Sequence, residues 1–189
     1  MKRILCFGDS NTYGYDPRSY FGSQYPLGVR WTGLLQNAGW EVVNCGQNGR
    51  CIPREPQLPA VTDLLRRVAA DVVTVMLGSN GLLNGATAEE TAEHMEALLR
   101  CMKENTKTAN IILIAPPPMQ FGDWVQTREL IDESKRLGGL YCALTDERSV
   151  TFADAGEWGV ALTFDGVHFS PEGHAAFAEE LIRTLKSLK

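Results

Sequence analysis

Three residues of the chain could together perform nucleophilic acyl chemistry. Ser10 carries a hydroxyl just after a short apolar segment, and His168 follows Asp165 by three residues in a turn that contains Gly166. A serine nucleophile needs a base that takes its proton and a third group that orients the base. The Asp-x-x-His spacing lets the carboxylate reach the near nitrogen of the imidazole while the far nitrogen points outward. These residues predict Ser10 as nucleophile, His168 as base and Asp165 as orienting acid.

Each of the three residues also has an ordinary structural explanation. A serine after a strand often caps the next helix, and an Asp-x-x-His pair can simply form a surface turn. The chain has two other histidines: His94 lies within a helical segment and His174 in the first turns of the last helical segment. The catalytic interpretation therefore depends on whether the fold brings Ser10 and His168 together.

A serine nucleophile also needs hydrogen-bond donors for the negative charge that develops on the carbonyl oxygen. Asn80 follows one apolar segment and offers a side-chain NH2 group, and Gly46 and Gly49 follow another and offer unobstructed backbone N–H groups. Asparagine and glycine are also common in turns, so each of these residues alone is weak evidence. Together they supply the donors that the chemistry requires.

Short apolar segments alternate with longer amphipathic ones along the chain. The uninterrupted run VVTVML is typical of a strand buried on both faces. Thr87 followed by Glu90 predicts a capping box at the start of one helix, and Ser170 followed by Pro171 predicts the start of the last. The expected strands are 4–7, 41–45, 72–77, 111–115 and 150–153, and the expected helices are 30–37, 59–70, 87 to about 105, 125–138 and the segment after Ser170.

This alternation predicts an α/β fold, a three-layer α/β/α sandwich with a central parallel sheet of about five strands, of the flavodoxin-like kind. The length of 189 residues fits a single domain, 1–189. In such sheets the ligand binds at the carboxyl ends of the strands. Ser10, Asn80 and the loop 46–49 are all expected there.

Composition argues against several other classes of protein. The formal net charge is −5, and a surface of that sign disfavours nucleic-acid binding. No basic run suggests a membrane surface, and no apolar run approaches the ~18 residues of a membrane span. The apolar stretch 4–7 is too short for a signal peptide, so we expect a cytoplasmic protein. The five cysteines match no CxxC motif, which disfavours a metal or redox site.

At the candidate catalytic and oxyanion residues, the sequence resembles the SGNH hydrolases, also called GDSL esterases. Four blocks of that family occur in order over nearly the whole chain: Gly8-Asp9-Ser10, N-x-G-x-x-G from Asn44 to Gly49, Gly78-Ser79-Asn80, and D-x-x-H from Asp165 to His168. The resemblance implies that Ser10 is the nucleophile, His168 the base and Asp165 its orienting acid. It also implies an oxyanion hole made by the N–H groups of Ser10 and Gly49 and the amide of Asn80, and it implies no metal or cofactor.

A closer likeness is to the bacterial arylesterase and acyltransferase branch of that family. The segments KRILCFGDSNTYGY, VVTVMLGSN, LIAPPPM, FADAG and DGVHF carry it. The likeness implies hydrolysis of short-chain, acetyl-like esters through an acyl-enzyme, with acyl transfer to alcohols in some members and larger oligomers in others. The expected partners are therefore a small-molecule ester and further copies of the chain. Tyr13, Tyr15 and Trp31 are candidates to line the substrate pocket, although ordinary packing explains them equally well.

One departure from the family pattern opens an alternative. The family usually has Asp after the oxyanion Asn, and here Gly81 stands in that place. The asparagine remains, but the three glycines between 78 and 85 reduce the rigidity of its loop. The alternative is a weakly active or inactive protein that binds acyl or carbohydrate esters. Other doubly wound classes fit less well, because the phosphate-binding patterns GxGxxG and GxxxxGK[ST] and the G-x-S-x-G elbow of α/β-hydrolases are absent.

Overall fold

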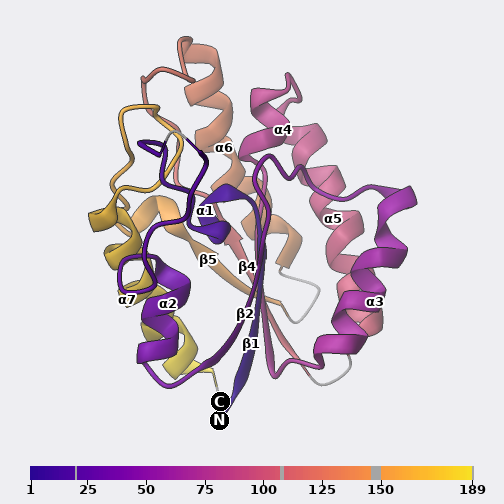
Figure 1. Ribbon diagram of the computed structural model, residues 1–189. Helices are drawn as coiled ribbons and strands as arrows, with labels where there is room; N and C mark the ends of the chain where they lie inside the picture. Colours follow the sequence, from indigo (N-terminus) through magenta and orange to yellow (C-terminus); the bar gives the residue numbers. More distant parts are fainter. Residues whose placement is uncertain (20, 107–108, 146–149, 189) are drawn as a thin grey trace.

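The computed structural model describes residues 1–19, 21–106, 109–145 and 150–188. Its centre is one sheet of five parallel strands in the order β2-β1-β3-β4-β5. This arrangement confirms the predicted α/β sandwich with a parallel sheet (Figure 1). The strands are β1 (Arg3–Gly8), β2 (Glu41–Gly46), β3 (Val72–Met76), β4 (Asn110–Ala115) and β5 (Thr151–Asp154).

Helices cover both faces of the sheet, as Figure 1 shows with the sheet seen nearly on edge. Alternate residues of a strand point to opposite faces. On β1, Ile4 and Cys6 belong to the core shared with α2 (Trp31–Asn37) and α7 (Pro171–Ser187), whereas Leu5 and Phe7 belong to the core on the other face. That second core is closed by α3 (Leu58–Val68), α5 (Ala88–Asn105) and α6 (Arg128–Thr145).

Two helices begin at the side-chain caps that the sequence predicts. The hydroxyl of Thr87 accepts a hydrogen bond from the N–H of Glu90, and the Glu90 carboxylate accepts one from the N–H of Thr87. The hydroxyl of Ser170 accepts a hydrogen bond from the N–H of Gly173, directly before α7. Both predicted caps are confirmed, because a cap depends on residues within one helical turn.

The helix predicted at 125–138 lies instead at Arg128–Thr145. Its start is later because Val125 is fully buried and pairs with Gly122 in a short bridge, which holds this segment in a non-helical path. Its end is later because Gly138 does not terminate it. A Cβ at position 138 would lie 2.5 Å from a carboxylate oxygen of Asp154, so this glycine allows the helix to pass close to β5.

Two short helices that the sequence pattern did not predict begin directly after strands. Helix α1 (Ser10–Tyr13) follows β1, and α4 (Ser79–Leu83) follows β3. Gly8 permits the tight turn into α1, because a Cβ there would lie 2.0 Å from the hydroxyl oxygen of Thr12. The strand order reverses at β1, which has β2 on one side and β3 on the other. The two helices therefore flank the crevice where ligands of such sheets bind.

Candidate active site

Ser10, His168 and Asp165 form one hydrogen-bonded chain. The Ser10 hydroxyl oxygen lies 2.9 Å from Nε2 of His168, and Nδ1 of His168 lies 2.6 Å from a carboxylate oxygen of Asp165. Ser10 begins α1, whereas Asp165 and His168 precede α7. Ser10 and His168 are 158 residues apart in the sequence. This geometry lets His168 accept the proton of the Ser10 hydroxyl while the carboxylate fixes the imidazole tautomer.

The carboxylate of Asp165 is held in its ionised form. Its second oxygen accepts hydrogen bonds of 2.9 Å from the Thr163 hydroxyl and from the N–H groups of Val167 and His168. Burial alone would raise the pKa of Asp165, but the bond from the His168 ring and the bonds from the N–H groups of His168 and Val167 outweigh it and lower the pKa to about 2. The group is therefore a carboxylate at neutral pH and can stabilise a protonated His168.

Two aromatic rings enclose the His168 imidazole. Tyr15 lies against it at a centroid distance of 4.7 Å, and Trp124 meets it edge-on at 4.9 Å. The indole of Trp124 is 52% exposed, so one part of it is open to a ligand. Sequence reasoning missed Trp124, because it lies in the irregular segment between β4 and α6. The backbone N–H of Trp124 donates to the Asp165 carbonyl oxygen at 3.1 Å, a contact between distant segments that no local pattern reveals.

The three aromatic residues expected at the substrate pocket have different positions. Tyr15 contacts His168. Tyr13 is half-buried, and its carbonyl oxygen accepts hydrogen bonds from the side-chain amides of Gln24 and Asn44. Trp31 is only 1% exposed and packs on Phe177 of α7, so it belongs to the core and does not line the site. The reason is that α2 turns its apolar face toward α7.

The expected oxyanion donors lie at the same edge of the sheet. Ser10 is the first residue of α1, so its N–H has no acceptor within the helix. Gly49 has a φ of 72° in the exposed loop after β2. The N–H of Gly46 is already bonded to the Asn44 side chain at 2.8 Å, which favours Gly49 over Gly46 as the backbone donor. Asn80 is the second residue of α4 rather than part of an irregular loop.

Arg50 fastens this loop to the end of β1. Its guanidinium donates to the Gly8 carbonyl oxygen at 2.9 Å, to the Cys45 carbonyl oxygen and to the Gln47 side chain at 2.9 Å. The same group lies over the Phe7 ring, with 4.4 Å to the ring centroid. Arg50 therefore holds the loop that carries Gly49 against the end of β1. The sequence offers no spacing signal for it.

Asp9 lies directly beside the expected nucleophile and is 2% exposed. One carboxylate oxygen accepts from the N–H of Asn11 at 3.0 Å, and the other accepts from the Asn80 amide at 3.4 Å. Burial raises its pKa to about 6, while the Asn11 N–H and the charges of His168 and Arg50 act in the opposite direction. Asp9 thus caps α1 and touches the amide that faces the site.

The other two histidines lie elsewhere. His94 is half-buried on α5. His174 is fully buried in α7, with its ring against Tyr25 and Phe169 and its Nδ1 accepting from the Trp31 N–H at 3.4 Å. Burial lowers the pKa of His174 to about 3, and the nearby charges of Arg30 and His168 act in the same direction. Of the three histidines, His168 is the one bonded to Ser10.

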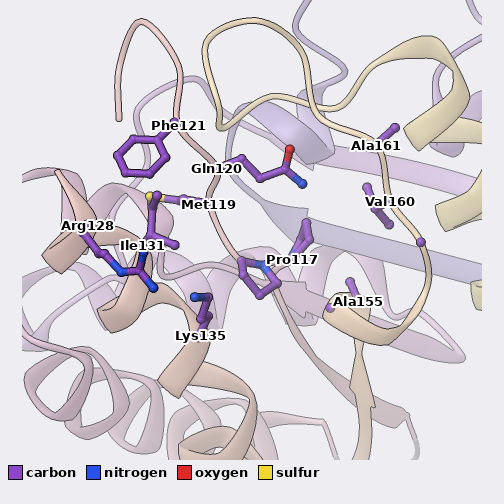
Figure 2. A pocket seen from close by; sticks show the side chains of 13 residues that line it. Pro117, Met119, Gln120, Phe121, Arg128, Ile131, Lys135, Ala155, Val160 and Ala161 are labelled. Atoms are coloured by element: carbon purple, nitrogen blue, oxygen red, sulfur yellow. The ribbon is translucent and has the colours of Figure 1, made fainter. Parts of the chain in front are cut away.

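A cavity of about 660 Å³ is lined in part by residues 117–121, which precede Trp124 in the chain. It is bounded by the segment after β4, by α6 and by the segment after β5, and Figure 2 shows labelled residues of these three segments around it. Ser10, Asp165 and His168 are not among its lining residues. The N–H of Gln120, one of the lining residues, donates to the Gly166 carbonyl oxygen at 3.0 Å, so one wall of the cavity is attached to the Asp165–His168 turn.

Across the described part of the chain, no group of three or more His, Cys, Asp or Glu side chains is arranged to hold a metal ion. Among the helices of the same residues, none is long and apolar enough to cross a membrane.

Comparisons with known proteins show the family of the chain. Residues 6–176 match the model of the GDSL-like lipase/acylhydrolase family. The M. smegmatis aryl esterase is 28% identical, with a TM-score of 0.84 and 100% of both chains covered. A carbohydrate acetylesterase family member from Sinorhizobium meliloti is 27% identical, with a TM-score of 0.85 and 98% of both chains covered. A comparison with curated proteins finds no match. The chain therefore belongs to the GDSL-like lipase/acylhydrolase family and is a carboxylic ester hydrolase of the SGNH type.

Proposed function

We propose that the chain cleaves short-chain, acetyl-like esters through an acyl-enzyme on Ser10, with His168 as general base and Asp165 as its orienting acid. The observation that carries this proposal is the unbroken chain from the Ser10 hydroxyl through His168 to Asp165, with distances of 2.9 and 2.6 Å. Three buried polar groups in this order are what nucleophilic acyl transfer needs.

The proposed reaction has two halves. The Ser10 oxygen attacks the ester carbonyl carbon as its proton passes to Nε2 of His168, and the tetrahedral intermediate then expels the alkoxide, which takes that proton and leaves as the alcohol. A water molecule next attacks the acyl-enzyme with His168 as base, and the carboxylic acid leaves as Ser10 regains its proton. When an alcohol takes the place of water, the same steps transfer the acyl group to that alcohol.

The oxyanion formed in both halves is assigned to the N–H groups of Ser10 and Gly49 and to the amide of Asn80. The Asn80 amide has two hydrogens. One is directed to the Arg50 carbonyl oxygen at 3.2 Å, whereas the contact to Asp9 is longer, at 3.4 Å. We assign to the oxyanion the hydrogen of the longer contact, which the oxyanion takes over from the Asp9 carboxylate. In many enzymes, fixed donors of this kind make the largest single contribution to stabilising the transition state.

The substrate class rests on the site and on similar proteins. The structures that resemble this chain include an aryl esterase and carbohydrate acetylesterases. The exposed part of Trp124 beside His168 offers an apolar surface for the acyl group or for the alcohol half of an ester. A small-molecule ester with an acetyl-like acyl group is the proposed substrate.

The alternative is an ester-binding protein with little turnover, because Gly81 replaces the usual Asp. The backbone hydrogen bonds of α4 favour an active enzyme over this alternative. The N–H of Gly81 donates to the Gly78 carbonyl oxygen, and the Gly81 carbonyl oxygen accepts from the Ala86 N–H, both at 3.0 Å. Asn80 is therefore held by main-chain bonds that do not need a carboxylate at position 81.

The proposal also covers the organisation of the chain. Both core clusters pack on the same five-stranded sheet, which supports residues 1–189 as a single domain. Assembly into a homo-oligomer is proposed from the sequence likeness alone.

Hydrolysis of 4-nitrophenyl acetate tests the proposal. The wild-type protein should release nitrophenolate, and Ser10→Ala should lose about 10⁴-fold or more in kcat. Adding a short alcohol should divert part of the acetyl group to the alkyl ester, which chromatography detects. A wild-type rate equal to that of Ser10→Ala would instead support the binding protein.

A further inference from the structure

The side chain of Asn11 forms hydrogen bonds with the backbone on both sides of His168, and this pair of bonds is called the grip of Asn11 below. Its Nδ2 donates to the Val167 carbonyl oxygen at 3.1 Å, and its Oδ1 accepts from the Phe169 N–H at 2.9 Å. Asn11 is 4% exposed, so these bonds are not shared with solvent. The amide therefore holds the peptide group before and the peptide group after the imidazole-bearing residue.

Asn11 is itself fixed to the opposite half of the site. It follows Ser10 in α1, its N–H donates to Asp9 at 3.0 Å, and its carbonyl oxygen accepts from the Trp31 indole at 2.8 Å. The nucleophile and the grip on His168 thus belong to two consecutive residues. The distance between Ser10 and His168 is set by this connection as well as by their own hydrogen bond.

We propose that Asn11 is a positioning residue that keeps His168 in register with Ser10 through both halves of the reaction. This inference rests on the proposed function. The direct bond between Ser10 and His168 is lost once the Ser10 oxygen carries an acyl group, yet His168 must then activate water at the same place. Asp165 restrains the Nδ1 side of the ring. The backbone grip of Asn11 persists in the acyl-enzyme because no reacting atom takes part in it.

The grip requires an amide. Asn and Gln are the side chains that offer a donor and an acceptor side by side without depending on a titratable proton, and Gln would add a methylene to a buried site. An ionised Asp keeps the acceptor for the Phe169 N–H but turns an oxygen without a hydrogen toward the Val167 carbonyl oxygen. Ala removes both partners and leaves two buried backbone groups unpaired.

The test compares Asn11→Ala and Asn11→Asp with Asn105→Ala as the matched control. Asn105 also uses both ends of its amide, donating to the Cys101 carbonyl oxygen at 2.8 Å and accepting from Arg66 at 3.0 Å, but it ends α5 at the opposite edge of the sheet. Each variant is assayed on 4-nitrophenyl acetate well below its melting temperature, with the folded state checked by circular dichroism. The rate of inactivation by a serine-directed phosphonate is measured in parallel.

Asn11→Ala is expected to lower kcat about 10- to 100-fold with KM little changed, the size that a misplaced catalytic group produces. The phosphonate reaction should slow by a similar factor, whereas Asn105→Ala should match the wild type in both assays. In Asn11→Asp, a carboxylate near the imidazole favours the protonated ring, so the acid limb of the pH–rate profile should move to higher pH. This second variant decides the matter if Asn11→Ala does not fold.

Two results overturn the inference in distinguishable ways. If the wild type reacts with ester and phosphonate and Asn11→Ala reacts as fast, or if Asn11→Asp keeps the wild-type pH profile and rate, only the positioning role fails. If the wild type reacts with neither, the proposed function fails and the role of Asn11 fails with it.

Discussion

The side-chain amide of Asn80 donates a hydrogen bond to the carbonyl oxygen of Arg50 across 3.2 Å. This bond joins α4, which follows β3, to the loop that follows β2 and carries Gly49. Two of the three proposed oxyanion donors, Asn80 and Gly49, are therefore connected through the backbone of Arg50. Movement of Asn80 would disturb the loop of Gly49 as well as remove its own donor.

Asn80→Ala should lower kcat on an acetyl ester by about 10²- to 10³-fold, the usual effect of losing one oxyanion donor. Asn84→Ala is the matched control, because Asn84 lies at the end of the same short helix and its amide contacts the exposed Cys51 thiol. Steady-state kinetics at one pH measure both. Equal, small losses in the two variants would contradict the assignment of Asn80.

Gly81→Asp should change kcat only modestly. Gly81 is not among the residues with positive φ, and a Cβ there would meet the Thr91 hydroxyl at 3.3 Å, which asks for a small adjustment of one side chain. The same kinetic assay checks this variant. Restoration of turnover by orders of magnitude from an inactive wild type would favour the ester-binding alternative.

His168→Ala should lose about 10⁴-fold in kcat, because Ser10 then has no base. His94→Ala should keep most of the activity, since His94 is half-buried on α5 and contacts none of the three residues in the chain from Ser10 to Asp165. Both are measured on the same ester at pH 7.5. A loss in His94→Ala as large as that in His168→Ala would show that the base is misassigned.

Stability should fall when the solution is acidified below about pH 6.5, in part because of His174. Its pKa is about 3 in the folded protein and near 6.5 when unfolded, so between these values the unfolded chain binds the additional proton. Within that window, each decrease of one pH unit lowers the free energy of unfolding by at most about 1.4 kcal/mol.

His174→Leu should remove this part of the pH dependence. Melting temperatures of the two proteins at pH 7.5 and 5.0 measure it, and the wild type should lose more on acidification. Asp9, with its raised pKa of about 6, acts in the opposite direction because the folded state binds its proton first, but it does so in both proteins and cancels in the comparison. Identical shifts in the two proteins would contradict the burial argument.

Acetyl to butyryl esters should have higher kcat/KM than octanoyl esters. The Ser10 side chain lies beside a histidine that is flanked on two sides by Tyr15 and Trp124, which limits the room for a long acyl chain. A series of 4-nitrophenyl esters of increasing chain length tests this directly. A steady rise of kcat/KM with chain length would point to a groove for lipid-like substrates.

Residues at strand ends were predictable because a parallel sheet brings all carboxyl ends to one edge. Ser10 and Asn80 needed only that rule, and the turn from Asp165 to His168 needed only local spacing. Trp124 and Arg50 were not predictable, because each reaches the site through bonds to distant backbone, such as that from Trp124 to Asp165.

Two further expectations fail where tertiary contacts override the local sequence. Trp31 was a candidate for lining the substrate pocket, yet the packing of α2 on α7 places its ring in the core. The bounds of α6 shift for the same kind of reason, since its start depends on the bridge at Val125 and its passage through Gly138 on the nearby Asp154.

The central claim is that Ser10 forms the covalent intermediate. The most direct measurement is mass spectrometry of the protein after reaction with a serine-directed phosphonate, followed by peptide mapping. We predict one adduct per chain, located on Ser10, and markedly slower labelling in His168→Ala, because the hydroxyl then lacks its base. An adduct on another residue, or undiminished ester turnover by Ser10→Ala, would contradict the account.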